Sequence, residues 1–206
     1  MSSRETILGS IRSHLAASVE FDRLELPVHD EPGIRVPAEA APVNLVELFK
    51  QSLEAVDCHC VVVQTEQEVT RIVRNFGGRI AISDAPVLAR LFDGETAVGA
   101  DEIFEFDVGI STAQAAIAET GTLVLDSACE RHRLVSLVPP VHIAIVDASR
   151  IVETLGEALA LLRRDKEISH AVTFVTGPSR TADIELTLAI GVHGPQELYV
   201  IINAQS

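Results

Sequence analysis

Residues 174–185 read Phe174-Val-Thr-Gly-Pro-Ser-Arg-Thr-Ala-Asp-Ile-Glu185, and Gly191-Val-His-Gly-Pro195 follows a few residues later. The β-branched residues of the first part predict a strand, which ends at a glycine–proline turn. The polar residues after the turn predict the start of a helix, from about Thr181 to Ile190. Because α/β proteins carry their ligands at strand-to-helix junctions, we expect a binding site here.

Two interpretations of this junction remain open. A proline is tolerated near a helix start, and Ser179 or Thr181 can cap the helix while the remaining amides face an anion. This favours a pocket for a carboxylate or phosphate, with Asp183 and Thr187 on one helical face. The alternative is an ordinary capped helix.

His193, in the second turn, can act as acid, base or hydrogen-bond donor, or it is a structural histidine.

Composition limits the class of protein. The chain has 206 residues, of which 47% are hydrophobic and 4% aromatic. These values predict one buried domain with an aliphatic core, as in strands covered by helices on both faces. The net charge of −14 opposes nucleic acid and anionic membranes as partners. No apolar run suits a signal peptide or a spanning helix, so we expect a cytoplasmic protein without membrane insertion.

The cysteines are few. The chain has 3 of them, fewer than the four thiolates of a usual iron–sulfur cluster, and an odd number argues against a disulfide framework. Cys58-His-Cys60 has the spacing of a metal-binding pair. It also begins an apolar strand, where a free cysteine is commonly buried, and we expect no metal on this chain.

The pattern divides the chain into an N-terminal arm, residues 1–43, and an α/β domain, residues 44–206. The arm begins with an amphipathic helix from Ser3 to about Ala17 and continues as a proline-punctuated strap. In the domain, helical and strand patterns alternate, with capping residues at Asn44 and Thr65. This alternation predicts an open, mostly parallel sheet with flanking helices.

The expected elements of the domain follow from periodicity and turn residues. The predicted strands are Cys60–Gln64, Arg79–Ser83, His142–Val146, Ala171–Thr176 and Leu198–Ile202, and the later helices span about 65–76, 86–92, 148–163 and 181–190.

One segment interrupts the alternation. Residues 115–125 predict two short strands joined at Glu119-Thr120-Gly121, which form a small antiparallel insertion. A buried carboxylate at Glu119 would cost several kcal/mol without a partner. Either this turn is exposed or it belongs to a polar site.

Separate blocks of the sequence resemble a known family in their order and spacing. The blocks are Ala118-Glu-Thr-Gly-Thr-Leu123, Leu137-Val-Pro-Pro-Val-His-Ile143, Gly177-Pro-Ser-Arg-Thr-Ala-Asp-Ile-Glu185 and Gly191-Val-His-Gly-Pro195. They resemble the LUD-domain family, of the lactate-utilisation protein C (YkgG) type, over roughly Asn44 to Asn203. The resemblance implies a fold similar to the NagB/RpiA/CoA-transferase group, whose members bind sugar phosphates or CoA esters.

The resemblance also implies a role in the cytosolic oxidation of L-lactate to pyruvate, together with two iron–sulfur partner proteins. Because this chain lacks cysteine clusters, the iron–sulfur clusters are expected on the partners. This chain would then be a non-redox subunit that binds a small anionic substrate, binds a partner or supports assembly. The alternatives are a stand-alone enzyme or sensor for a small carboxylate or phosphorylated metabolite, and a purely structural partner-binding module.

Matched position by position, the motifs supply the candidate ligand-binding residues. These are Glu119, Thr120, Gly121, Thr122, His142, Gly177, Ser179, Thr181, Asp183, Glu185, His193 and Gly194. The candidates for catalysis are Glu119, His193 and Asp183. An acyl-transfer role for Glu119 would follow the glutamate nucleophiles of CoA-transferases, which is an analogy of fold.

Overall fold

The computed structural model describes residues 3–17, 44–92, 102–127, 133–164, 171–182, 188–190 and 194–204. Helix α1 (Ser3–Ala17) forms over the residues that the sequence predicted. The predicted strap lies outside the described residues. Of the helices that the structure describes, none combines the length and apolar character needed to cross a lipid bilayer.

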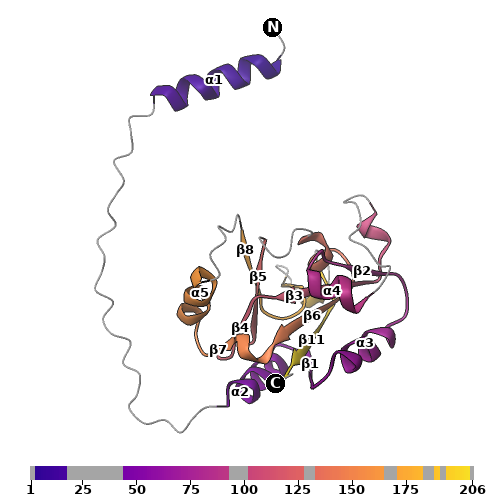
Figure 1. Cartoon of the computed structure of the whole chain (residues 1–206). Coiled ribbons are helices and arrows are strands. Elements are labelled where there is room, and N and C mark those ends of the chain that lie inside the picture. Colours follow the sequence, from indigo (N-terminus) through magenta and orange to yellow (C-terminus); the bar gives the residue numbers. More distant parts are fainter. Residues whose placement is uncertain are drawn as a thin grey trace, which may run out of the picture. The chain divides into compact units, whose positions relative to one another are not determined.

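A five-stranded sheet forms the centre of the domain (Figure 1). Its strands, in spatial order, are β1 (His59–Val63), β11 (Glu197–Asn203), β6 (Val141–Asp147), β3 (Val108–Ala113) and β2 (Ile80–Ile82). Every neighbouring pair is parallel. The predicted open parallel sheet is therefore confirmed, although the sequence pattern missed β3.

The two faces of this sheet bury alternate residues of each strand. Ile143 and Ile145 of β6 pack on the side of α3 (Glu66–Arg74) and α4 (Pro86–Leu91). The residues between them, such as Ala144, pack on the opposite side, against α2 (Leu45–Ala55) and a second sheet. Figure 1 shows α3 and α4 across the parallel sheet from this second sheet. By the two-residue period of a strand, His142 lies on the same side as Ala144.

The second sheet is mixed and four-stranded, in the order β7 (Ile151–Val152), β4 (Ala115–Ile117), β5 (Thr122–Asp126) and β8 (Val172–Val175). The antiparallel pair β4–β5 confirms the predicted insertion. The predicted strand 171–176 exists as β8, but it pairs antiparallel with β5 and does not continue the parallel sheet. Helix α5 (Leu155–Arg164) packs on this sheet through Ala158.

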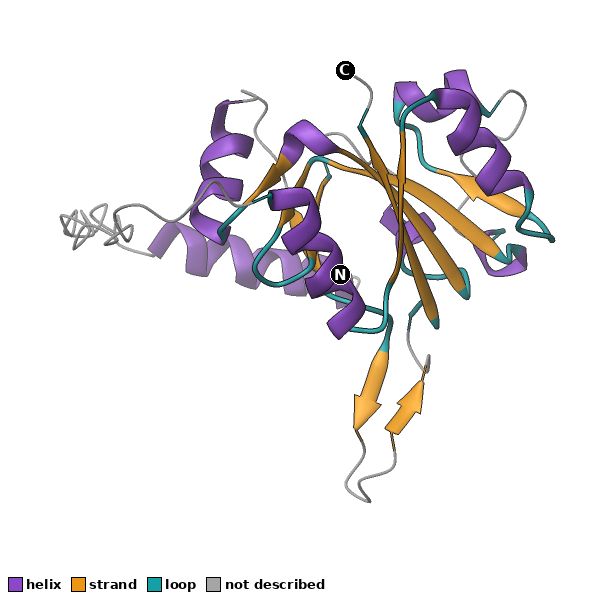
Figure 2. Cartoon of the chain, turned by 90° about the horizontal axis from the view of Figure 1, so that it is seen from below, coloured by secondary structure: helices purple, strands orange, loops and turns teal. Residues whose placement is uncertain are grey.

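The predicted helix over residues 181–190 is wrong. Strands β9 (Arg180–Ala182) and β10 (Leu188–Ile190) pair antiparallel there, and Figure 2 shows this two-stranded ribbon extending from the body of the domain. Threonine and isoleucine recur through the segment, and such β-branched residues favour strands over helices. The expected helix start after Gly177 is therefore a strand start. Asp183 and Thr187, for which a shared helical face was predicted, lie outside the described residues.

The predicted helix from Ala148 to Arg163 begins later than expected. A short 3₁₀ turn, η3 (Ala148–Arg150), and strand β7 precede α5. The amide of Glu157 donates to Thr154 Oγ1, and the Glu157 carboxylate accepts from the amides of Glu153 and Thr154. This reciprocal capping fixes the helix start, and the sequence pattern placed it too early.

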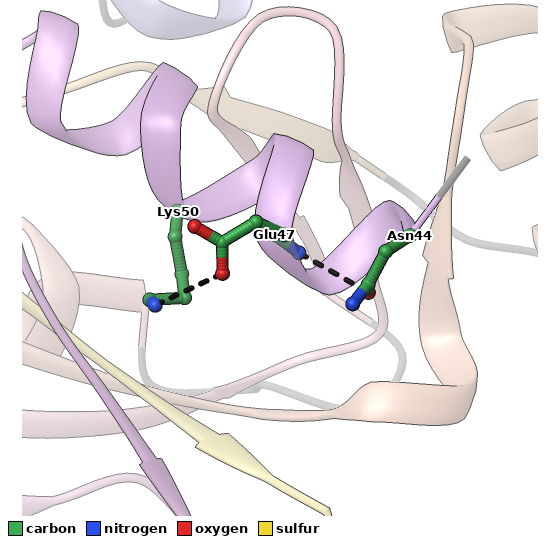
Figure 3. Close-up of polar contacts among 3 residues, drawn as sticks. All are labelled: Asn44, Glu47 and Lys50. Carbon is green, nitrogen blue, oxygen red and sulfur yellow. Dashed lines mark hydrogen bonds and ion pairs between the residues drawn. The ribbon is translucent and has the colours of Figure 1, made fainter.

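The predicted caps of the first two domain helices are confirmed. Asn44 accepts a hydrogen bond from the amide of Glu47, whose carboxylate accepts from Lys50 (Figure 3). Thr65 accepts from the amide of Glu68 in the same way. Each cap satisfies a backbone donor that the helix itself leaves without a partner.

Candidate functional site

A cavity of about 250 Å³ lies at the amino ends of β6 and β11, beside strand β8. Its lining combines hydroxyl groups, one imidazole, glycine backbone and apolar side chains. The lining residues are Ser136, Leu137, His142, Thr173, Phe174, Val175, Thr176, Gly177, Ser179, Gly194, Pro195 and Leu198. Strands β6 and β11 are parallel neighbours, and Leu198 pairs directly with His142, so the amino ends of the two strands meet at the cavity.

Two segments that are distant in sequence form one wall of the cavity. The amide of Ser179 donates to the carbonyl oxygen of Pro195 over 2.7 Å. A Cβ atom on Gly194 would lie 3.1 Å from the Cβ of Ser179, closer than ordinary van der Waals contact. Because Gly194 has no side chain, the two segments can approach each other this closely.

His142 lies at the floor of the cavity and is fully buried. Its Nε2 atom is 2.8 Å from the hydroxyl oxygen of Ser111, on the neighbouring strand β3. Its Nδ1 atom has no hydrogen-bond partner among the described residues. Burial lowers the pKa of His142 to about 4, because the apolar surroundings disfavour the charged imidazolium. The ring is therefore neutral near pH 7.

The Gly177 turn packs against the loop that precedes β1. Gly177 has a φ of +85°, and a Cβ there would lie 3.0 Å from the carbonyl oxygen of Val56. Arg180, next to the motif serine, forms an ion pair with Asp57 and does not line the cavity. Burial raises the pKa of the nearby Cys58 to about 11, so this cysteine is a protonated thiol in the core.

The Glu119 turn does not line the cavity but is hydrogen-bonded to its wall. Glu119 and Thr120 are exposed, so this carboxylate carries no cost of burial, and its role in a site stays a prediction. The hydroxyl of Thr122 lies 2.7 Å from the hydroxyls of both Thr120 and Thr176. Because Thr176 lines the cavity, this hydroxyl chain connects the turn to the wall.

Gly121 fixes the position of that turn. It has a φ of +65°, and a Cβ atom there would lie 2.8 Å from the carbonyl carbon of Ser52 in α2. A side chain at this position would therefore be strained by conformation and by contact. The motif glycine serves the packing of β4 and β5 against α2.

The predicted site residues thus separate into groups. His142, Gly177, Ser179 and Gly194 share the cavity, while Glu119, Thr120, Gly121 and Thr122 form the turn that is hydrogen-bonded to its wall. Thr181 belongs to β9. Asp183, Glu185 and His193 lie outside the described residues. The ligand-binding and catalytic roles of all these residues stay predictions.

Sequence reasoning missed the partner of the buried histidine. Ser111 is a buried polar residue between the apolar Ile110 and Thr112 of strand β3, and that break in apolar character was the available signal. Phe174 and Thr176 lie in the predicted strand before the glycine–proline turn, and no pattern in the sequence marks them as lining residues. They reach the cavity because β8 lies in the second sheet.

A larger hollow of about 470 Å³ lies along α3 and α4. Arginines 71, 74 and 90 line it, but Arg90 is already paired with Glu66. It contains none of the motif residues and is open to solvent. The smaller cavity is the better candidate because it alone of the two joins the motif residues with a buried, unpartnered polar atom.

The lining suits a small polar molecule. It supplies hydroxyl groups and a neutral imidazole for hydrogen bonds, and apolar side chains such as Leu198 for packing. Among the described residues, no cluster of three or more histidine, cysteine or acidic side chains is arranged to hold a metal ion. Drug-sized ligands occupy pockets of roughly 300–1,000 Å³, so this cavity fits a smaller compound or one end of a larger one.

The fold defines an α/β protein with an open parallel sheet and a small cavity beside it. The chain belongs to the LUD domain family, whose model matches residues 89–203. The resemblance found in the sequence blocks is thereby confirmed. A crystal structure of a DUF162 family protein from Deinococcus radiodurans has a similar fold, with a TM-score of 0.60 and 24% identity over 80% of this chain and 99% of that chain.

The chain is also similar to curated proteins. It is 34% identical over 163 residues to an uncharacterized protein of Neisseria meningitidis, covering 77% of this chain and 66% of that protein. It is 31% identical over 225 residues to lactate utilization protein C of Exiguobacterium sp., covering 98% and 97%. With lactate utilization protein C of Bacillus subtilis it shares 38% identity over 102 residues, which span 47% of this chain and 42% of that protein.

Proposed function

We propose that this protein is a non-redox subunit of a system that oxidises L-lactate to pyruvate. The observation that carries the proposal is the similarity to lactate utilization protein C along nearly the whole of both chains, 98% of this one and 97% of the relative. The separate motif blocks support it, because His142, Gly177, Ser179 and Gly194 meet at one cavity.

The cysteine content supports a non-redox role. The whole sequence has 3 cysteines, whereas a usual iron–sulfur cluster needs four thiolates, so this chain does not fit such a cluster alone. Cys58 is a buried thiol whose pKa is raised to about 11 by burial, and it would resist forming the thiolate that a metal binds. The proposal therefore assigns the iron–sulfur clusters to partner proteins.

In this proposal the cavity holds a small organic acid or its product. A volume of about 250 Å³ accommodates a three-carbon compound, and Ser179 and His142 offer hydrogen bonds to it. Phe174 and Leu137, each partly exposed at the lining, offer apolar contact and a surface that a partner protein can cover.

Association with partners tests the proposal. A tagged chain expressed from its native locus in cells growing on L-lactate is expected to copurify with two iron–sulfur proteins. Deletion of its gene is expected to abolish growth on L-lactate while growth on glucose persists. A chain that never associates with iron–sulfur proteins, and whose deletion leaves growth on L-lactate unchanged, would contradict the proposal.

A second candidate is a stand-alone enzyme or sensor that binds a small carboxylate or phosphorylated metabolite. It is favoured by the fact that this single chain supplies a lined cavity. Thermal-shift measurements with L-lactate, pyruvate, sugar phosphates and CoA esters test it, with Ser179→Ala as the cavity variant. Two results together would favour this candidate. A ligand stabilises the isolated wild-type chain but not Ser179→Ala, and the chain does not copurify with iron–sulfur proteins.

A further inference from the structure

The pair formed by Ser111 and His142 is the only described place where a buried side-chain hydroxyl meets a buried imidazole at the cavity. Ser111 is 2% exposed and His142 is fully buried. The contact between Ser111 Oγ and His142 Nε2 measures 2.8 Å, a normal hydrogen bond. The other ring nitrogen, Nδ1, has no partner among the described residues although the ring lines the cavity.

The hydrogen bond between Ser111 and His142 decides which nitrogen of the His142 ring carries the proton. A neutral imidazole has one donor nitrogen and one acceptor nitrogen, and the bond made by one nitrogen sets the role of the other. Among the described residues, the hydroxyl of Ser111 has Nε2 as its single hydrogen-bond partner. If Nε2 were the donor, the buried hydroxyl hydrogen would lack an acceptor. If the hydroxyl donates to Nε2, both the hydroxyl hydrogen and Nε2 have a partner.

With Nε2 as acceptor, the proton lies on Nδ1. The ring then presents an N–H donor that has no protein partner, which is a costly arrangement for a buried group. A ligand oxygen that accepts this hydrogen bond removes the cost. Burial also lowers the pKa of His142 to about 4, so the donor is neutral at pH 7.

The other lining residues indicate whether the ligand oxygen that faces Nδ1 belongs to a carboxylate or to a carbonyl. None of the described lining residues is a lysine, an arginine or an acid. A carboxylate hydrogen-bonded to Nδ1 would lose its hydration without gaining a nearby cation, which costs free energy. An uncharged carbonyl oxygen needs only the neutral N–H donor. The group facing His142 is therefore expected to be a carbonyl.

We propose that Ser111 is a positioning residue that holds the proton of His142 on Nδ1, and that this N–H selects a carbonyl-bearing ligand in the cavity. The ligand carries a carbonyl that accepts the hydrogen bond. That this carbonyl is the 2-oxo group of a small acid, and the choice of three-carbon acids as probes, rest on the proposed function, while the assignment of the proton does not.

Nitrogen NMR of protein labelled with ¹⁵N-histidine tests the proton position without any ligand. The His142 signals are assigned by their loss in His142→Gln. At pH 7 the wild-type ring is expected to be neutral with the proton on Nδ1. In Ser111→Ala the proton is expected to distribute over both nitrogens, whereas Ser83→Ala, a buried serine with no bond to His142, leaves the spectrum unchanged. A wild-type proton on Nε2, or an unchanged ring in Ser111→Ala, would overturn the assignment.

Binding of pyruvate and propionate, which share a carboxylate and differ by the 2-oxo group, tests the ligand class. Calorimetry on the full chain is expected to show pyruvate binding about fivefold tighter than propionate, as one added neutral hydrogen bond allows. The advantage is expected to shrink in Ser111→Ala and to persist in Ser83→Ala. Equal affinities in the wild type, or an advantage that Ser111→Ala keeps, would overturn the selection by His142. Neither result depends on copurification with iron–sulfur proteins, so the two proposals fail separately.

Discussion

The hydroxyl groups of Thr122 and Thr176 lie 2.7 Å apart and join strand β5 to the turn that carries Ser179. This bond couples the Glu119 turn to the cavity wall. Replacing either threonine by valine keeps the shape and removes the bond. Thr176→Val is expected to reduce the free energy of unfolding by about 0.5–1.5 kcal/mol, the usual net value of one hydrogen bond. Thr122→Val also removes the bond to Thr120 and is expected to cost more than Thr176→Val.

The double variant Thr122→Val/Thr176→Val completes the thermodynamic cycle. Once one hydroxyl is gone, removing the other is expected to cost less, because their mutual bond is already lost. Urea unfolding of all four proteins measures the coupling. Costs that simply add would show that the two hydroxyls do not interact.

Gly121→Ala tests the packing of the same turn on α2. The added Cβ would lie 2.8 Å from the backbone of Ser52, at a φ of +65° that alanine avoids. We expect a loss of about 2 kcal/mol or more in the free energy of unfolding. Gly77→Ala is the matched control, because no atom lies within 4 Å of its Cβ and its φ is not positive. Equal stability of the two variants would contradict this packing.

Burial of neutral His142 predicts a pH dependence of stability. Its pKa is lowered from 6.5 to about 4 in the folded protein, so the unfolded chain binds the extra proton as pH falls through this window. The stabilisation is present above pH 6.5 and is lost progressively down to about pH 4. The slope contributed by this group is up to about 1.4 kcal/mol per pH unit.

His142→Gln removes the titrating group and is expected to flatten that slope. The comparison uses the change in unfolding free energy between pH 7 and pH 5, so that any constant cost of the substitution cancels. Urea unfolding at each pH provides the measurement. A variant with the same slope as the wild type would show that His142 is not held neutral by burial.

Glu119→Gln is expected to leave both stability and ligand binding nearly unchanged. Glu119 is exposed and does not line the cavity. Substitutions at such sites usually change stability by less than about 0.5 kcal/mol. Thermal unfolding and pyruvate titration check the two expectations. A large loss of binding would show that Glu119 contributes to the ligand site.

Local patterns predicted the elements whose signals are local. The caps at Asn44 and Thr65, the parallel strands rich in valine and isoleucine, and the pair around the Glu119 turn all appear as predicted. Strand β3 was missed because Gly109 and Ser111 interrupt its apolar run. Glycine is needed at position 109 because of a tertiary contact: a Cβ there would lie 1.9 Å from the carbonyl oxygen of Val135.

The segment after Gly177 was mispredicted because its apolar residues fit both a helical and a strand period. Its pairing as β9 and β10 decides the outcome. The site shows the same limit. The motif placed His142 among the candidates, but its partner Ser111 lies on a neighbouring strand, and such a pairing depends on sheet register that no local pattern contains.

We propose that the cavity between the Ser179 and Gly194 segments is the site through which this protein acts in lactate utilisation. Gly194→Ala tests it, because its Cβ would lie 3.1 Å from that of Ser179 and force the cavity wall to shift. The matched control is Gly156→Ala in α5, where the nearest atom is 3.9 Å away. Both variants are expected to accumulate as folded protein.

The most direct measurement is growth on L-lactate of a strain that lacks the gene and carries the wild-type or a variant copy. We predict that the wild type and Gly156→Ala restore growth, while Gly194→Ala, present at the same level, does not. Full growth with Gly194→Ala would contradict the assignment of function to this cavity.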